Sequence, residues 1–230
     1  MPQETKAIQD FEHVIASEMD LQDALRSGEL DGYAIRNFCI KRANFNEKTL
    51  KNVLLHRITM EHIDCSDMTV NELQITESAL RGSAFQRSEI SAINIQNCQA
   101  MECEFDECIV QDSNFFSSEM QKVSYFHGKL IKTQFQDANL YGASFGNAFL
   151  AQCSFTDTRS LVPEMSRCDF SRAMIIDTVL KGANLFAANF SEAVLIRCDL
   201  RGVNLAMADL RGATIIDCKY GPGDFDGAQR

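Results

Sequence analysis

The sequence predicts an all-β solenoid in which the chain winds into a square coil. The first observation is a row of large apolar residues at every position divisible by five from Phe45 to Ile215, broken only at Cys65, Ala100 and Ser160. The second is a row of residues two places before each of these, which is mostly small from residue 138 onward. A chain that buries two residues in every five needs a stack of turns to bury them.

A period of five excludes ordinary helices and flat strands. Five helical residues turn through about 500°, which would scatter the apolar positions around the helix. In a flat strand, successive fivefold positions would point to opposite faces. The chain must therefore turn a corner within each five residues, so that four corners close a coil of about 20 residues. About 35 such units make nearly nine coils and a rod of roughly 42 Å at the spacing of β-strands.

Three segments carry the repeat most clearly. Residues 138–142 read ANLYG, residues 183–187 read ANLFA, and residues 208–212 read ADLRG, all matching the unit A-(D/N)-L-x-x. By this unit the chain resembles the pentapeptide-repeat protein family over roughly residues 30 to 220. The resemblance implies a right-handed quadrilateral β-helix, to which we assign residues 30–220.

Residues 1–29 are expected to form a short helical cap over the first coil. Residues 4–15 have the spacing of an amphipathic helix, with Ile8, Phe11 and Ile15 on its apolar stripe. Asp20 is the predicted N-cap of a second short helix, which ends at Ser27 and Gly28. A cap is expected because a stacked rod exposes backbone at its ends. The alternative is a partner-binding or export segment.

Two places should interrupt the stack. Between residues 158 and 165 the centre is the polar Ser160, and Pro163 takes an inner position, which predicts a bulged corner with Leu161 or Val162 displaced. The period of five continues across it. Residues 221–230 begin with Gly-Pro-Gly-Asp and are predicted to be a C-terminal tail that stops the stack.

Catalytic, metal and cofactor sites are not predicted. Most of the nine cysteines fall at the inner minor position, where they serve as small buried hydrophobes, and we expect free thiols. Cys98, Cys103 and Cys108 point inward from successive sides of one coil, but their spacing is that of the repeat and no histidine joins them. The motifs of phosphate loops and nucleophile elbows are missing from the sequence.

Charge, hydropathy and cysteine content limit the ligands and the cellular compartment that are compatible with the sequence. The net charge of −10 disfavours direct binding to nucleic-acid phosphates. No apolar run approaches the roughly 18 residues of a membrane span, and the first residues do not read as a secretory signal. Cysteines without such a signal favour a reducing compartment, so a cytoplasmic location is expected.

The outward residues divide into four faces if every coil has 20 residues. One face is then acidic, and Glu164, Arg87 and Arg167 are assigned to it as well. A mixed face combines acids such as Glu61 and Asp199 with bases such as Lys122 and Arg201. The candidate acidic face comprises Glu47, Asp64, Asp67, Glu104, Asp106 and Glu107.

A second outward feature is apolar. Three pairs of outward residues fall in the same two columns of successive coils and predict a continuous exposed apolar strip, which usually marks a contact surface. The alternative is that the tail covers it. This candidate patch for a protein partner or a second copy comprises Met174, Ile176, Val194, Ile196, Thr214 and Ile216.

These features favour a non-enzymatic scaffold that binds another protein through its outer faces, because filled coils leave no central pocket. The family resemblance implies two alternatives. One is a mimic of DNA that binds and protects DNA gyrase from quinolones, to which the acidic face would contribute. The other is an effector exported by a bacterial secretion system, with the N-terminal segment as its address. Fold alone decides little between them.

Overall fold

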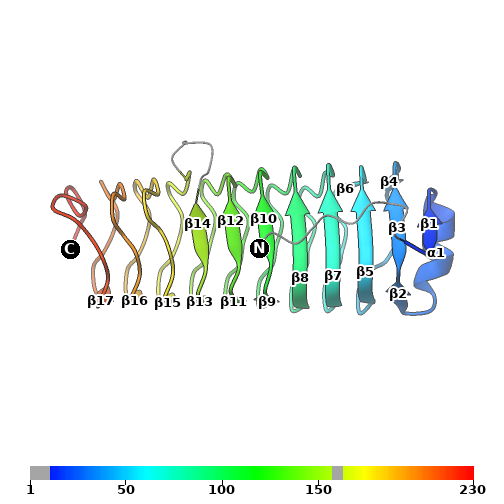
Figure 1. The fold of residues 1–230 in the computed structure, drawn as a ribbon, viewed down its shortest axis with the longest axis horizontal. Coiled ribbons are helices and arrows are strands. Elements are labelled where there is room, and N and C mark those ends of the chain that lie inside the picture. The colour runs from blue at the N-terminus through cyan, green and yellow to red at the C-terminus, as the bar shows by residue number, and fades with distance from the viewer. Residues whose placement is uncertain (1–10, 157–162) are drawn as a thin grey trace.

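The computed structural model describes residues 11–156 and 163–230 and has the predicted architecture, a four-sided parallel β-solenoid (Figure 1). It has about 10 turns, against the nearly nine predicted. Every strand pair among the described residues is parallel, and most paired residues are 20 positions apart, as in the pairing of Val194 with Thr214. Each coil therefore hydrogen-bonds to the coils before and after it.

The four sides follow one another in chain order. Side 1 contains β2 (Glu29–Asp31), the first parts of β5 (Thr49–His56), β7 (Thr69–Thr76) and β8 (Glu89–Gln96), then β9 (Ile109–Gln111), β11 (Lys129–Ile131), β13 (Phe149–Ala151), β15 (Met174–Ile176), β16 (Val194–Ile196) and β17 (Thr214–Ile216). Side 2 contains β1 (His13–Ile15), β3 (Tyr33–Arg36), the second parts of β5, β7 and β8, then β10 (Asn114–Phe116), β12 (Gln134–Gln136) and β14 (Ser154–Thr156).

Sides 3 and 4 have little extended strand. Side 3 begins with β4 (Cys39–Ile40) and β6 (Thr59–Met60) and continues as single bridges from Ala79 to Asn204. Side 4 is a column of single bridges from Asp64 to Gln229. Each side is five residues long, so the buried centre of every repeat falls in the middle of a side.

The corners explain why five residues make one side. The residue two places after almost every described centre adopts a left-handed backbone, as at Asp67 (φ 57°) and Glu107 (φ 59°). Such a residue turns the chain, and its N–H then donates to the next coil, at 2.9 Å from Asp67 N to the carbonyl oxygen of Gln86. Glycine removes the steric cost of this conformation at Gly142 and Gly182.

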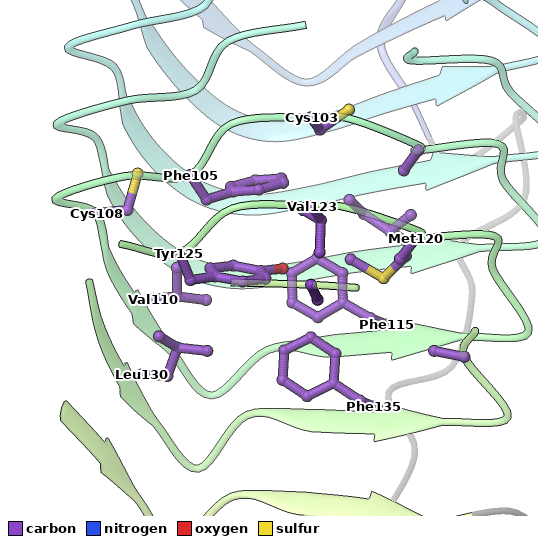
Figure 2. Close-up of a cluster of buried hydrophobic side chains, with 14 of the residues drawn as sticks. Cys103, Phe105, Cys108, Val110, Phe115, Met120, Val123, Tyr125, Leu130 and Phe135 are labelled. Carbon is purple, nitrogen blue, oxygen red and sulfur yellow. The ribbon is translucent and has the colours of Figure 1, made fainter. Parts of the chain in front are cut away.

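Two columns of stacked aromatic rings fill the middle of the rod (Figure 2). On side 4, ring centroids of consecutive coils lie 4.8 to 5.3 Å apart. On side 2 the spacing is 4.9 Å, and the two columns meet edge to face at 5.8 to 6.0 Å. Each such pair adds about 0.5–1.5 kcal/mol beyond burial. The columns are Phe85, Phe105, Tyr125, Phe145, Phe170 and Phe190, and Phe115, Phe135 and Phe155.

The inner minor positions satisfy backbone groups between coils. Ser83 Oγ accepts from the N–H of Ile63 at 3.2 Å and donates to the carbonyl oxygen of Met60 at 3.1 Å. Cys103 takes the same position one coil later, and its Sγ donates to the carbonyl oxygen of Leu80 at 3.0 Å. Serine, threonine and cysteine therefore occur here because they are small and can hydrogen-bond inside the rod.

The N-terminal end differs from the sequence prediction in two ways. The helix is α1 (Glu18–Leu25), and its N-cap is Ser17, whose Oγ accepts from the N–H of Asp20 at 3.2 Å. Asp20 is instead the third helical residue, and its carboxylate accepts from the Ser17 hydroxyl at 2.6 Å. In addition, β1 replaces the end of the predicted helix, because Ile15 pairs with Ile35 in the sheet of side 2. Residues 11 and 12 are not helical either, and residues 4–10 of that predicted helix lie outside the described residues.

One coil is longer than the others. Phe149 of β13 pairs with Met174 of β15, a separation of 25 residues, whereas neighbouring coils pair at 20. Thus one complete five-residue unit is inserted, which is why the fivefold period continues while the sides shift. The predicted centre Ser160, with Arg159 and the displaced Leu161 or Val162, lies outside the described residues.

The last ten residues continue the stack, where a stop is predicted. Gln229 pairs with Asp209 on side 4, and the N–H of Met207 donates to the carbonyl oxygen of Gly227 at 2.9 Å. Phe225, two fivefold positions after Ile215, packs against the core. The tail thus forms part of another coil, because its glycines supply corner residues, as at Gly227 (φ 76°).

Candidate protein-binding surface

The buried cysteines have the environment of structural residues. All nine cysteines are free thiols, as predicted. Burial raises the pKa of the Cys98 thiol to about 11 and that of Cys103 and Cys108 to about 12. Such thiols stay protonated at neutral pH and are poor ligands and nucleophiles. Within residues 11–156 and 163–230, no group of three or more metal-ligating side chains comes together.

The 25-residue coil corrects the predicted assignment of residues to faces. Glu164 pairs with Asn184 on side 3, and the N–H of Arg167 donates to the carbonyl oxygen of Phe186 on that side, so neither residue lies on the acidic side. Asp169 takes the predicted place of Glu164 by pairing with Ser144. The mixed face also divides, because Asp199 lies on side 2, away from Glu61 and Lys122.

The six residues of the acidic face do share side 4 and its corner with side 1. Asp64, Ala84 and Glu104 pair in one ladder, and Glu47, Asp67 and Glu107 occupy the adjoining corner. Much of this charge is engaged locally. Asp67 binds Arg87 at 2.6 Å, and Asp106 accepts from the N–H of Phe126 at 2.9 Å and from the Ser124 hydroxyl. The hydrogen bond from Arg87 lowers the pKa of the exposed Asp67.

The candidate apolar patch forms one continuous surface on side 1. Met174, Val194 and Thr214 pair directly in successive strands, and so do Ile176, Ile196 and Ile216. Met174 and Ile216 are each 43% exposed, while Val194 and Ile196 are half-buried. The tail pairs with side 4 and leaves these side chains exposed, so the alternative in which it covers them is not supported.

The patch is longer than the sequence analysis predicted. Because the insertion sets β13 beside β15, Phe149 pairs with Met174 and Ala151 with Ile176. Both side chains are half-buried. An assumed coil of 20 residues placed them on a different side, and the polar Ser160 and Pro163 were the only local signs of an insertion. We call the combined surface the apolar ladder, which comprises Phe149, Ala151, Met174, Ile176, Val194, Ile196, Thr214 and Ile216.

Ion pairs border the apolar ladder along both long edges. At the corner before β15 and β16, Arg172 binds Glu192 at 3.0 Å. At the opposite corner, Arg197 binds Asp177 through two hydrogen bonds of 2.7 and 2.8 Å. The hydrogen bond from Arg197 lowers the pKa of Asp177. An apolar centre with a charged rim is the usual anatomy of a protein–protein contact.

The C-terminal end has a separate hollow. A cavity of about 510 Å³ opens beneath the last coil, where Leu210, Ile215 and Phe225 approach the surface. The guanidinium of Arg230 lies 5.3 Å from the centre of the Phe225 ring. β17 pairs only with β16 among the described strands, so this end of side 1 is an open sheet edge. A search of the described residues for membrane-spanning helices finds none of sufficient length and apolarity.

Comparison with known proteins identifies eight copies of the pentapeptide repeat, at residues 127–159, 164–191 and 178–215. No curated protein matches the sequence. Among solved structures, the chain is similar to a trypsin-treated variant of QnrB1, described as a plasmid-mediated fluoroquinolone resistance protein, with 16% identity over 91% of both chains and a TM-score of 0.47. Full-length QnrB1 has 15% identity over 91% of this chain and 92% of its own, with a TM-score of 0.42. The pentapeptide repeat protein Rfr23 from the cyanobacterium Cyanothece 51142 has 12% identity over 93% and 99%, with a TM-score of 0.19.

Proposed function

We propose that this chain, which carries eight copies of the pentapeptide repeat, is a non-catalytic scaffold that binds another protein through the apolar ladder. The observation that carries this proposal is the continuity of the ladder over four successive coils, from β13 to β17, with Met174 and Ile216 each 43% exposed. Contiguous exposed apolar surface is uncommon on proteins without a contact there. The free thiols support a reducing compartment such as the cytoplasm.

The filled core supports the non-catalytic part of the proposal. The centres of the coils are occupied by stacked aromatic and aliphatic side chains, which fill the inside of the rod before its C-terminal hollow. The shifted pKa values belong to buried thiols, to the buried phenol of Tyr125 and to surface ion pairs or turn carboxylates, all of which have structural explanations. A rigid rod with one apolar strip is suited to docking a partner.

The test immobilises the wild type and the variants Ile196→Asp and Met207→Asp, and compares the interacting proteins that each one captures. We expect Ile196→Asp to lose the bound protein, because a carboxylate would be buried in the apolar centre of the contact. Met207→Asp is the matched control, since Met207 is 59% exposed and lies outside the ladder. Binding that both variants retain equally would remove the ladder as the contact surface. Thermal melting of each variant confirms that the rod is folded.

The second candidate function is that of a DNA mimic that binds and protects DNA gyrase. Its basis is side 4, whose N-terminal half carries the six acidic residues. B-DNA of about 48 Å, the length of 10 coils, carries about 28 phosphate charges, whereas this whole chain has a net charge of −10. The charge density is therefore well below that of DNA, and we rank this function second. Unchanged supercoiling and DNA binding by purified gyrase at a large excess of this protein would exclude it.

A further inference from the structure

We propose that the apolar ladder binds a second copy of this chain, in an antiparallel arrangement around a two-fold axis that crosses side 1 between β15 and β16. This inference rests on the proposed function, since it names the partner of the same surface. Three features support this dimer: the placement of charge along the two edges of the ladder, the position of the ladder on the rod, and the residues that would meet in each orientation.

The charges at the rim of the ladder complement themselves. At one corner the order toward the C-terminus is Arg172 then Glu192, and at the other corner it is Asp177 then Arg197. A two-fold axis perpendicular to the rod exchanges the coil of β15 with the coil of β16 and keeps each corner opposite itself. Arg172 then faces Glu192 of the second copy, and Asp177 faces Arg197 of the second copy. Each ion pair becomes half of a four-charge network without juxtaposing like charges.

The same axis also centres the apolar residues. The ladder occupies the coils of β13, β15, β16 and β17, and its midpoint lies between β15 and β16. Met174 would meet Val194 of the second copy, and Ile176 would meet Ile196 of the second copy. The coil of β13 would meet the coil of β17. At one corner Asn147 would face Gly212 of the second copy, and at the other Gln152 would face Asp217 of the second copy, so no like charges meet there. The polar half of side 1 extends away from the contact in both copies and stays in water.

A parallel arrangement fits the charges less well. An axis along the rod would also match the four rim charges, but it would place the whole length of side 1 in the contact. Lys129 would then approach Lys132 of the second copy, and Glu29 would approach Asp31 of the second copy. Like charges brought together in this way oppose association. The polar N-terminal coils therefore select the antiparallel arrangement.

The contact is small, which sets the expected strength. The four coils of the ladder span only about 19 Å along the rod. The area buried on each copy is therefore expected to be smaller than the roughly 800 Å² per partner of a standard interface. We expect a reversible dimer with a dissociation constant of roughly 1–100 μM. The two-fold contact uses each ladder once, so association through the ladder should stop at the dimer.

The experiment is sedimentation equilibrium of the full chain over a range of concentrations. The wild type should convert from monomer to dimer, whereas Ile196→Asp and the more exposed Met174→Asp should remain monomeric and Met207→Asp should dimerise normally. A wild type that stays monomeric at about 1 mM overturns the proposal. Retained dimerisation of both Asp variants in the ladder also overturns it. Partner capture that depends on Ile196 would still support the proposed function when the dimer fails.

The orientation is tested by exchanging the charges at one corner only. The double variant Asp177→Arg/Arg197→Asp keeps an ion pair within each copy. In the antiparallel dimer each corner faces itself, so the exchanged charges still complement each other and the dissociation constant should change less than about threefold. In a parallel dimer the new arginine would face Arg172 and the new aspartate would face Glu192. Loss of dimerisation in this variant alone therefore overturns the antiparallel arrangement.

Discussion

Replacement of Tyr125 by phenylalanine should stabilise the protein, which is an unusual outcome for a fully buried tyrosine. Tyr125 is 0% exposed, and its ring stacks on Phe105 at 5.1 Å and on Phe145 at 5.3 Å. Its hydroxyl oxygen lies among apolar side chains (Figure 2) and has no hydrogen-bond partner within the described part of the chain. Tyr125→Phe keeps the stacked ring and removes the unpartnered group.

The magnitude follows from the cost of an unsatisfied buried hydroxyl, about 1–3 kcal/mol. The free energy of unfolding should rise by that amount, and for a chain of this size the melting temperature should rise by about 2–12 °C. Chemical denaturation followed by circular dichroism measures the change in free energy, provided that the transition of the variant keeps the slope of the wild type.

The matched control places the hydroxyl one coil further along. Phe145→Tyr adds the same group to the same aromatic column and should lower stability by a similar amount, with an extra cost if the column is already tightly packed. The reasoning is refuted if Tyr125→Phe lowers the free energy of unfolding, because this would mean that the hydroxyl has a partner that holds it in the native state.

Three further outcomes are expected. Ser83→Ala should lower the free energy of unfolding by about 1–2 kcal/mol in urea titrations, because it removes the acceptor of the Ile63 N–H; an unchanged midpoint would contradict this. Burial raises the pKa of Cys103 to about 12. The stability that this protonated thiol contributes to folding is therefore complete below its unfolded pKa near 8.5, and it falls as pH rises toward the folded pKa, by about 2 kcal/mol per such thiol between pH 8 and 10. Thermal melts at both pH values should show a smaller loss of stability at pH 10 for Cys103→Ala than for the wild type. Hydrogen bonds from Arg211 lower the pKa of Asp209 to about 2. The stability that the Asp209 carboxylate contributes to folding is therefore present above about pH 4 and is lost as pH falls toward 2. Arg211→Gln should reduce this dependence of the melting temperature on acid pH, and identical melting profiles for the variant and the wild type would count against the ion pair.

The sequence predicts the core because each fivefold position has one structural role. Leu140, Leu185 and Leu210 are all buried at the centres of their sides, as the row of apolar residues requires. The free thiols and the corner glycines follow from the same period. These features repeat in every coil, so that local exceptions do not obscure them.

The sides of the rod are less predictable than its core. A unit of five residues inserted before Met165 leaves every centre in place but moves all later residues by one side, so a count by fives cannot detect it. The six predicted residues of the apolar ladder all follow the insertion in the sequence, so a coil of 20 residues aligns them correctly. Phe149 and Ala151 precede the insertion, so the same coil length assigns them to a different side of the rod. The N-cap was missed because Ser17 and Asp20 both suit that position, and only the backbone geometry distinguishes them.

The most direct test of side 1 as the contact surface uses the exposed Cys39 as a site for a spin label, with Cys218 replaced by serine. In the antiparallel dimer the two Cys39 residues lie at opposite ends of the assembly, about 65–70 Å apart along the rod axis at 4.8 Å per coil. Because β4 lies on side 3, across the rod from the contact on side 1, the full separation is larger than this axial distance. A pulsed dipolar measurement should give a distance of at least about 65 Å, and Ile196→Asp should abolish it. A distance well below about 65 Å, as in side-by-side parallel rods, or the same distance in the Ile196→Asp variant, would contradict a two-fold contact between β15 and β16.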